Sequence, residues 1–233
     1  MNVTTHFQDL GVIEYKKAWD YQQRLFDGTV QMKFDNRKLP EEERRTTRNY
    51  LLFCEHPHVY TLGKSGDMAN LLVKEEKLKE IEASYFPINR GGDITYHGPG
   101  QIVAYPIFDL DYFFTDIHKY LRYLEDVIIK VLERYDLKGE RSPGETGVWL
   151  DVGTPKARKI CAMGIKASRW VTMHGLAFNV NSNLEYFNYI VPCGITDKAV
   201  TSLDVEVDRK LDYEVVKGQV KEAFKVGFGL EYV

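Results

Sequence analysis

The sequence predicts an α+β fold, with a mixed β-sheet and helices packed mainly on one side of it. Short apolar runs typical of strands outnumber the segments with helical spacing, and several neighbouring runs lie close enough to form hairpins. The helical segments are few and widely spaced, unlike the regular alternation of a doubly wound fold. Because no internal repeat or low-complexity linker divides residues 1–233, we expect a single domain.

Three segments have the apolar spacing of a helix: residues 14–30, 116–135 and 213–226. The second is the clearest, since apolar residues recur at i, i+3 and i+4 from Ile117 to Leu132, and Thr115 is a candidate N-cap. The period-two and apolar runs predict strands at residues 50–54, 59–62, 85–89, 102–108, 147–150, 159–165 and 176–180.

The composition is that of an ordinary globular protein, with 44% hydrophobic and 28% charged residues. A net charge of −3 gives no general attraction for nucleic acid or anionic membranes. No apolar run approaches the ~20 residues that span a bilayer, and the N-terminus lacks a secretion-signal pattern. The three cysteines have no disulfide-framework spacing. We therefore expect a cytoplasmic protein with reduced thiols, monomeric by default, that binds neither nucleic acid nor membrane.

The run from Arg90 to Gln101 is the most informative segment, because it holds four glycines, a proline, an arginine and a histidine. Each interior glycine costs a helix about 1 kcal/mol relative to alanine. We therefore expect a loop whose backbone passes very close to another group, at a sheet edge where a ligand can bind. The run matches neither the P-loop nor the dinucleotide-binding pattern, so it predicts no nucleotide site.

Cys193 is a candidate nucleophile, because Pro192 and Gly194 place its thiol on a constrained turn. Cys54 lies in an apolar strand-like run, where a packing role is expected. Only a few per cent of a free thiol is ionised at neutral pH, so a nucleophilic cysteine needs a base or a nearby cation. The residues that could supply one are His97, His174, Lys159 and Lys166. A cysteine–histidine and a cysteine–lysine pair both stay open on these grounds.

Lys159 begins a strand-like run in which strict alternation would put Lys159, Cys161 and Met163 on one face. Taken alone, this pattern favours a solvated Lys159, and it keeps Cys161 as a rival nucleophile. His174 precedes Gly175 and an apolar run, which is typical either of a ligand contact or of a turn into a strand. The alternation of Cys54, His56 and His58 is interrupted by Pro57, and no second cluster complements it, so we expect no metal.

Together these segments resemble the lipoyl(octanoyl) transferase family, the octanoyl-[acyl-carrier-protein]–protein N-octanoyltransferases. The resemblance covers most of the chain and rests on motifs in a fixed order: His56-Pro57-x-Val59-Tyr60-Thr61-Leu62-Gly63, Arg90–Gln101, Lys159-Ile160 with Met163-Gly164-Ile165, His174-Gly175-Leu176-Ala177-x-Asn179-Val180, and Pro192-Cys193-Gly194.

The resemblance implies a single α+β domain like that of biotin and lipoate protein ligases. It also implies that Cys193 carries the octanoyl group as a thioester and that Lys159 lowers the pKa of this thiol. The segments implied to bind the substrate are Arg90, Gly91, Gly92, Asp93, Ile94, Thr95, Tyr96 and His97, then Ala162, Met163 and Gly164, and finally His174, Gly175, Leu176 and Ala177.

The implied reaction is the first step of protein lipoylation. It moves octanoyl from octanoyl-acyl carrier protein to the lysine of a lipoyl domain, as in 2-oxoacid dehydrogenase complexes or the glycine cleavage H protein. It needs no cofactor except the phosphopantetheine arm of the donor. The closest alternative is an ATP-dependent lipoate or biotin ligase on the same fold, which needs no cysteine. A non-catalytic acyl- or carrier-binding module and a thiol protease are more distant alternatives.

Overall fold

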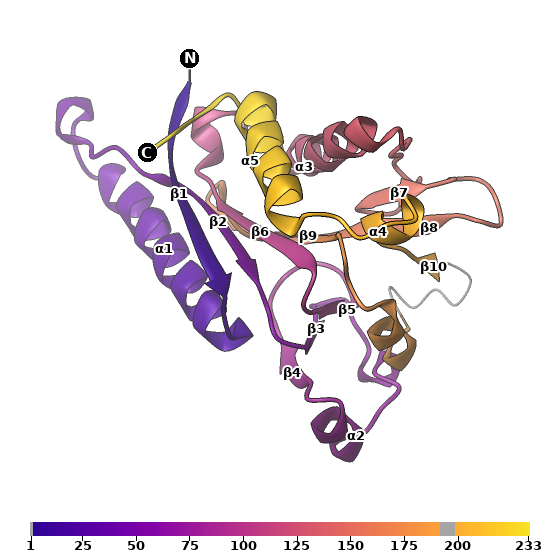
Figure 1. Ribbon diagram of the computed structural model, residues 1–233. Coiled ribbons are helices and arrows are strands. Elements are labelled where there is room, and N and C mark those ends of the chain that lie inside the picture. Colours follow the sequence, from indigo (N-terminus) through magenta and orange to yellow (C-terminus); the bar gives the residue numbers. More distant parts are fainter. Residues whose placement is uncertain (1, 192–198) are drawn as a thin grey trace.

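The computed structural model describes residues 2–191 and 199–233. Within them, one large sheet contains β1 (Val3–Val12), β2 (Asn49–Glu55), β6 (Gln101–Ile107), β7 (Val148–Leu150), β8 (Arg158–Ser168), β9 (Val171–Asn179), β10 (Ala199–Val200) and β11 (Leu230–Tyr232). Its strand order is β10-β8-β9-β6-β2-β1-β11, with β7 also paired to β8 (Figure 1). The sheet is mixed, since β1 runs parallel to β2 and β11 whereas β6 is antiparallel to both of its neighbours.

A smaller sheet lies beside the large one, as Figure 1 shows. In the described residues it has the order β4-β3-β5, from β3 (Val59–Leu62), β4 (Ser84–Pro87) and β5 (Ile94–His97). Strand β5 lies inside the segment that the sequence analysis assigns to a loop. The glycines at either end of β5 therefore form the turns, and only the middle of the segment pairs with β3.

Helices cover both faces of the large sheet. Ala18 and Phe26 of α1 (Tyr15–Asn36) pack on Leu52 and Val103 on one face. On the other face, α3 (Ile117–Leu132) and α5 (Tyr213–Phe228) enclose the main core (Figure 1). The expectation that the helices lie mainly on one side is wrong. Every residue of β6 is buried, so both of its faces need an apolar cover.

The three predicted helices are present, although α1 extends to Asn36 and the side chain that caps α3 is Asp116, not Thr115. The sequence analysis missed β1, whose polar and apolar residues do not alternate cleanly and which is mostly half-exposed. It also missed β10, β11 and the short helices α2 (Glu75–Glu80) and α4 (Leu203–Glu206), which are too short to show a period.

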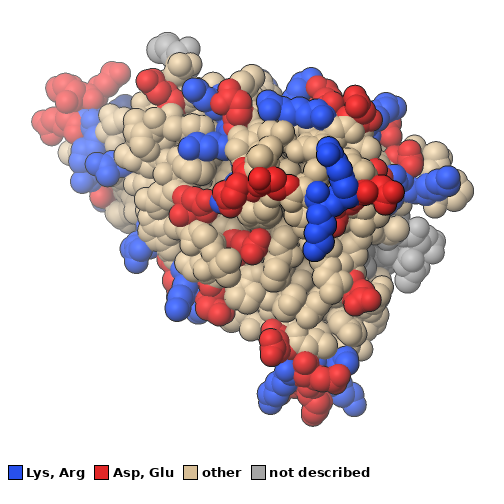
Figure 2. All heavy atoms as spheres, viewed as in Figure 1, with Lys and Arg blue, Asp and Glu red and all other residues tan. Residues whose placement is uncertain are grey.

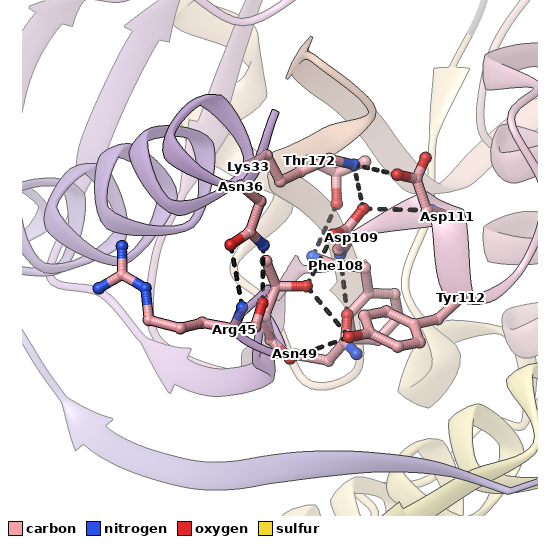
Figure 3. Close-up of polar contacts among 10 residues, drawn as sticks. Lys33, Asn36, Arg45, Asn49, Phe108, Asp109, Asp111, Tyr112 and Thr172 are labelled. Carbon is pink, nitrogen blue, oxygen red and sulfur yellow. Dashed lines mark hydrogen bonds and ion pairs between the residues drawn. The ribbon is translucent and has the colours of Figure 1, made fainter. Parts of the chain in front are cut away.

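A buried polar cluster fixes the C-terminal part of α1 to the end of β6 (Figure 3). Lys33 forms ion pairs with Asp109 and, at 2.7 Å, with Asp111. The Thr47 hydroxyl donates to the Asp109 carboxylate at 2.7 Å, and the Asp109 N–H donates to Asn49 Oδ1 at 2.8 Å. With this end of α1 anchored, its first residue, Tyr15, is held against the small sheet, where it packs with Val59 and Ile88.

Acidic and basic side chains are interspersed over the face seen in Figure 2, in keeping with the small net charge. Among the described helices, none is both long and apolar enough to cross a bilayer.

Candidate active site

A cavity of about 430 Å³ opens between the small sheet and strands β8 and β9, a volume typical of small-molecule sites. The predicted binding segments meet there. The predicted residues that line the cavity are Arg90, Gly91, Gly92, Asp93, Ile94, Thr95, His97, Lys159, Ala162, Met163, Gly164, His174, Gly175, Leu176 and Ala177. Their roles in catalysis and binding stay predictions, but residues from three distant segments line one cavity.

Tyr96 is the exception among the predicted binding residues in the described part of the chain, because it does not line the cavity. It is fully buried in the small core beneath the second sheet, between Tyr60 and Tyr186, and its hydroxyl bonds to His58 Nδ1 at 2.7 Å. The reason is the alternation of side chains along β5, which sends Tyr96 to the face opposite Thr95 and His97. The resemblance places Tyr96 in a binding segment, but the structure gives it a packing position away from the cavity.

Close backbone contacts hold the loop at the mouth of the cavity. The Gly91 N–H donates to the Ile165 carbonyl on β8 at 2.8 Å. A Cβ on Gly63 would lie 2.2 Å from the Gly92 carbonyl oxygen, and one on Gly164 would lie 2.8 Å from that of Gly91. Larger residues at Gly63 and Gly164 would force the loop away from β3 and β8. The prediction that this backbone passes very close to another group is thus confirmed.

Lys159 lies at the cavity wall and is only 9% exposed. Its ammonium is 4.6 Å from the centre of the Trp149 ring, in a cation–π contact. The expectation that Lys159 is solvated is therefore wrong. Its place at the cavity, with little of the side chain exposed to solvent, makes Lys159 a candidate for chemistry.

A β-bulge in β8 separates Lys159 from Cys161. Val148 of β7 pairs with Cys161, but the next residue, Trp149, pairs with Lys159, so β8 has one extra residue here. As a result Ile160 and Cys161 both pack in the core under α3 and α5, while Lys159 faces the cavity. The prediction that Lys159 and Cys161 share a face is wrong, because strict alternation does not hold across a bulge.

The two described thiols are buried and are not poised as nucleophiles. Burial raises the pKa of both Cys54 and Cys161 well above the usual range, and neither residue lines the cavity. Cys193, the predicted nucleophile, lies outside the described residues. The strand that follows it in sequence, β10, is parallel to β8 and pairs Val200 with Lys159, and Val200 lines the cavity.

Comparison with known proteins gives the family. Residues 15–225 match the model of the lipoyl protein ligase A/B catalytic domain. The chain belongs to this family. It is 61% identical to an octanoyltransferase of Christiangramia forsetii over 99% of this chain and 98% of the relative. It is 60% identical to an octanoyltransferase of Flavobacterium psychrophilum over 96% of each chain.

The fold of this lipoyl protein ligase A/B family member agrees with solved structures. A bipartite lipoate protein ligase of Thermoplasma acidophilum superimposes with a TM-score of 0.70 at 14% identity, over 100% of this chain and 86% of that one. The predicted fold class, a mixed sheet with packed helices like that of the lipoate protein ligases, is confirmed.

The cavity of this family member contains uncharged histidines. Burial lowers the pKa of His97 and of His174 to about 3, and the nearby guanidinium of Arg90 acts in the same direction on both. Burial also lowers the pKa of His56 to about 4. These rings are neutral at pH 7 and are weak bases, so a lysine amine is better suited than they are to take a proton from a thiol or an ammonium.

His174 and Lys166 have different surroundings. His174 lines the cavity from within β9 at a φ of +60°, and its N–H donates to Gln22 Oε1 at 3.0 Å. The reading of His174 as a turn before a strand is therefore wrong. Lys166 does not line the cavity; its ammonium lies 4.8 Å from the centre of the Phe26 ring of α1. Of the four candidate partners for a thiol, Lys159 thus combines a basic amine with a place at the cavity.

Several cavity residues were not predicted. Leu121 and Phe187 add apolar surface, and Tyr15, Gln101 and Asn179 add polar groups. Gln101 and Asn179 lie inside recognised motifs, so the pattern could have identified them. Tyr15 and Leu121 lie on helices with ordinary amphipathic spacing, and nothing in that spacing distinguishes a cavity residue from a core residue.

Proposed function

We infer that this chain is an octanoyltransferase that transfers an octanoyl group to the lysine of a lipoyl domain. The observation that carries this inference is the 61% identity, over nearly the whole of both chains, to a curated octanoyltransferase. The structure supports it with a cavity of suitable size, whose lining includes the apolar residues Leu121, Met163 and Leu176.

The proposed donor is an octanoyl thioester on the phosphopantetheine arm of an acyl carrier protein. In the first half-reaction the Cys193 thiolate attacks the thioester carbonyl, a new C–S bond forms, the old C–S bond breaks, and the carrier leaves as a thiolate that takes up the proton of the Lys159 ammonium. One thioester replaces another, so the step is nearly isoenergetic and requires neither ATP nor a metal. We propose that the Lys159 ammonium stabilises the thiolate before attack.

In the second half-reaction the lysine amine of the lipoyl domain attacks the acyl-enzyme. The C–N bond of the amide forms, the bond to Cys193 sulfur breaks, and the amine gives up a proton. We assign this proton to the neutral amine of Lys159, because the neighbouring histidines are weak bases. Amide formation from a thioester is downhill, which drives the sequence forward.

Intact mass spectrometry tests this function. Wild-type protein mixed with octanoyl-acyl carrier protein is expected to gain one octanoyl group, and the adduct should transfer to an added lipoyl domain. Cys193→Ser should abolish the thioester adduct, whereas Cys161→Ala and Cys54→Ala should retain it, since both thiols are buried away from the cavity. An adduct on Cys193→Ser in normal yield would show that another residue is the nucleophile.

A parallel reaction separates transfer from ligation. The protein is incubated with octanoate, ATP and a lipoyl domain, without any carrier protein. Octanoylation of the domain under these conditions would favour the ATP-dependent ligase, and its absence, together with transfer from the carrier, supports the proposed function.

A further inference from the structure

A chain of buried side-chain hydrogen bonds runs from the cavity to strand β10. His97 Nδ1 lies 2.8 Å from Gln101 Oε1, and Gln101 Nε2 donates to Asn179 Oδ1 at 2.8 Å. Asn179 Nδ2 in turn donates to the Thr201 carbonyl at 2.9 Å. Gln101 and Asn179 are 1% and 3% exposed, and they are also direct partners in the β6–β9 ladder. The four residues of this chain, His97, Gln101, Asn179 and Thr201, have no role in the mechanism described above.

The order of donors and acceptors in this chain determines the tautomer of His97. The Gln101 amide nitrogen faces two oxygens, those of the Tyr96 carbonyl at 3.3 Å and Asn179 Oδ1 at 2.8 Å. If the Gln101 amide were rotated by 180°, its oxygen would face these two oxygens and neither hydrogen bond could form. Gln101 Oε1 therefore faces His97, and only an N–H at Nδ1 can complete this contact. A neutral ring with its proton on Nδ1 has a lone pair on Nε2.

The Nε2 atom of His97 is available to a ligand. In the part of the chain that the structure describes, Nδ1 is the ring nitrogen of His97 that makes a hydrogen bond, and the residue lines the cavity. Tyr15 of α1 stacks on the ring with the two planes 9° apart, which holds its orientation. His97 thus presents a hydrogen-bond acceptor, and not a donor, to whatever enters.

We propose that Gln101 is a positioning residue for acyl transfer, which with Asn179 holds His97 as the Nδ1–H tautomer so that Nε2 accepts a hydrogen bond from an N–H group of the substrates. This role rests on the proposed octanoyltransferase function. The side-chain amides of Gln101 and Asn179 also connect the His97 ring to Thr201. The N–H of Thr201 donates to the Lys159 carbonyl at 2.9 Å. The acceptor at His97 and the backbone of Lys159 are thereby linked by one chain of hydrogen bonds.

The surroundings of His97 keep its ring neutral. The titratable and charged groups around it are Tyr15 from α1, His56 after β2, Arg90 before β5 and His174 from β9. His56, Arg90 and His174 all disfavour a positive charge on the ring, and burial does so most strongly. A neutral acceptor does not repel the ammonium of an incoming lysine. The substrates bring two kinds of N–H donor, the amides of the pantetheine arm and the attacking amine.

The test compares Gln101→Glu and Gln101→Met with wild type. A glutamate at this position keeps the acceptor for Nδ1–H and adds a negative charge, so the pKa of His97 is expected to rise by two units or more. Methionine has a similar length and accepts no comparable hydrogen bond, so the ring should lose its single tautomer. Both properties are read from NMR spectra of protein labelled with ¹⁵N-histidine. Gln31→Glu, an exposed glutamine of α1, is the matched control and should leave the His97 signals unchanged.

Rates of the two half-reactions complete the test. At pH 7 Gln101→Met should be at least tenfold slower than wild type. Gln101→Glu should lose rate relative to wild type as the pH falls through the new His97 pKa, because the imidazolium has no lone pair on Nε2 to accept a hydrogen bond. A purely structural defect would not follow this pKa. If only the rate of adduct formation falls, the pantetheine amides donate the hydrogen bond to His97 Nε2. If only the rate of transfer falls, the attacking amine donates it.

The proposal is overturned if both variants keep the wild-type tautomer and pKa of His97, or if both half-reactions of Gln101→Met stay within twofold of wild type at pH 7. A wild-type protein that forms no octanoyl adduct would overturn the proposed function itself, and this role with it, whatever the spectra show. The two failures are distinguishable, because the first concerns the variants and the second concerns the wild type alone.

Discussion

The backbone N–H of Thr201 donates a 2.9 Å hydrogen bond to the carbonyl oxygen of Lys159. Together with the pairing of Val200 to Lys159, this bond ties the strand that follows the predicted nucleophile segment to the backbone of the cavity lysine. The side chain of Lys159 is held separately, over the Trp149 ring. Backbone and side chain are thus positioned by different contacts, so substitutions of the side chain can test its chemistry while β10 stays paired.

Lys159→Arg should separate the two roles proposed for this lysine. Arginine keeps the positive charge that favours a thiolate but does not lose its proton at accessible pH. We expect octanoyl adduct formation to stay within about tenfold of wild type, and transfer to the lipoyl domain to fall by about 10²-fold or more. Single-turnover measurements of each half-reaction check this. Equal losses in both steps would contradict a role as base.

Acid should destabilise the fold through its buried histidines. The pKa is about 3 for His97 and His174 and about 4 for His56 in the folded state, all lowered mainly by burial. The unfolded chain therefore binds more protons between about pH 4 and pH 6.5, and the free energy of unfolding rises with pH across this window. The stabilisation is complete above about pH 6.5. As the pH falls below this value, each ring lowers the free energy of unfolding by up to about 1.4 kcal/mol per pH unit.

The variant His56→Gln isolates one of these contributions. Glutamine can donate to the Ile13 carbonyl and accept from the Tyr105 hydroxyl, as the His56 ring does at 2.7 and 2.8 Å. Urea unfolding between about pH 4.5 and 6 should give a slope smaller than that of wild type by up to about 1.4 kcal/mol per pH unit, and above about pH 7 the two slopes should agree. An unchanged slope would mean that the His56 ring is not neutral in the folded protein.

Gly175→Ala should destabilise the protein and disturb the cavity. A Cβ here would lie 2.2 Å from the Ala104 carbonyl oxygen and 2.6 Å from Pro106 Cδ, so β9 would have to move away from β6. We expect a loss of about 3 kcal/mol in the free energy of unfolding. Gly28→Ala is the control, because this α1 position has open space around it, and it should be about 0.5–1 kcal/mol more stable than wild type. Chemical denaturation measures both, and similar values for the two variants would refute the close contact.

The buried thiols Cys54 and Cys161 should resist alkylation in the folded state. Both are shielded from solvent, and burial raises the pKa of each, so the reactive thiolate is rare. Peptide mapping after iodoacetamide treatment should show labelling of these two residues at least 100-fold slower in buffer than in denaturing urea. Rapid labelling of Cys161 in buffer would restore it as a candidate nucleophile.

Motif recognition located the candidate site better than period analysis did. The glycine content of Arg90–Gln101 predicted a ligand-binding loop, and the family resemblance added the segments near Gly164 and Gly175. Residues of all three segments line one cavity. Period analysis placed Lys159 in solvent and on one face with Cys161. The second error comes from the bulge between β7 and β8, which depends on the partner strand and leaves no local pattern. The first arises because Lys159 is covered by Trp149 and lies beside β10, which come from other parts of the chain.

The amino-acid sequence by itself determined the local chemistry of this protein: the glycines that permit a tight loop, the periods of the three main helices, and the types of side chain available for catalysis. Only the tertiary structure decided which of these groups meet, that Tyr96 faces away while His97 faces the cavity, and that His97, Gln101, Asn179 and Thr201 form one hydrogen-bonded chain. The physical reason is that strand pairing and bulges join residues far apart in sequence, and burial then sets their charge states.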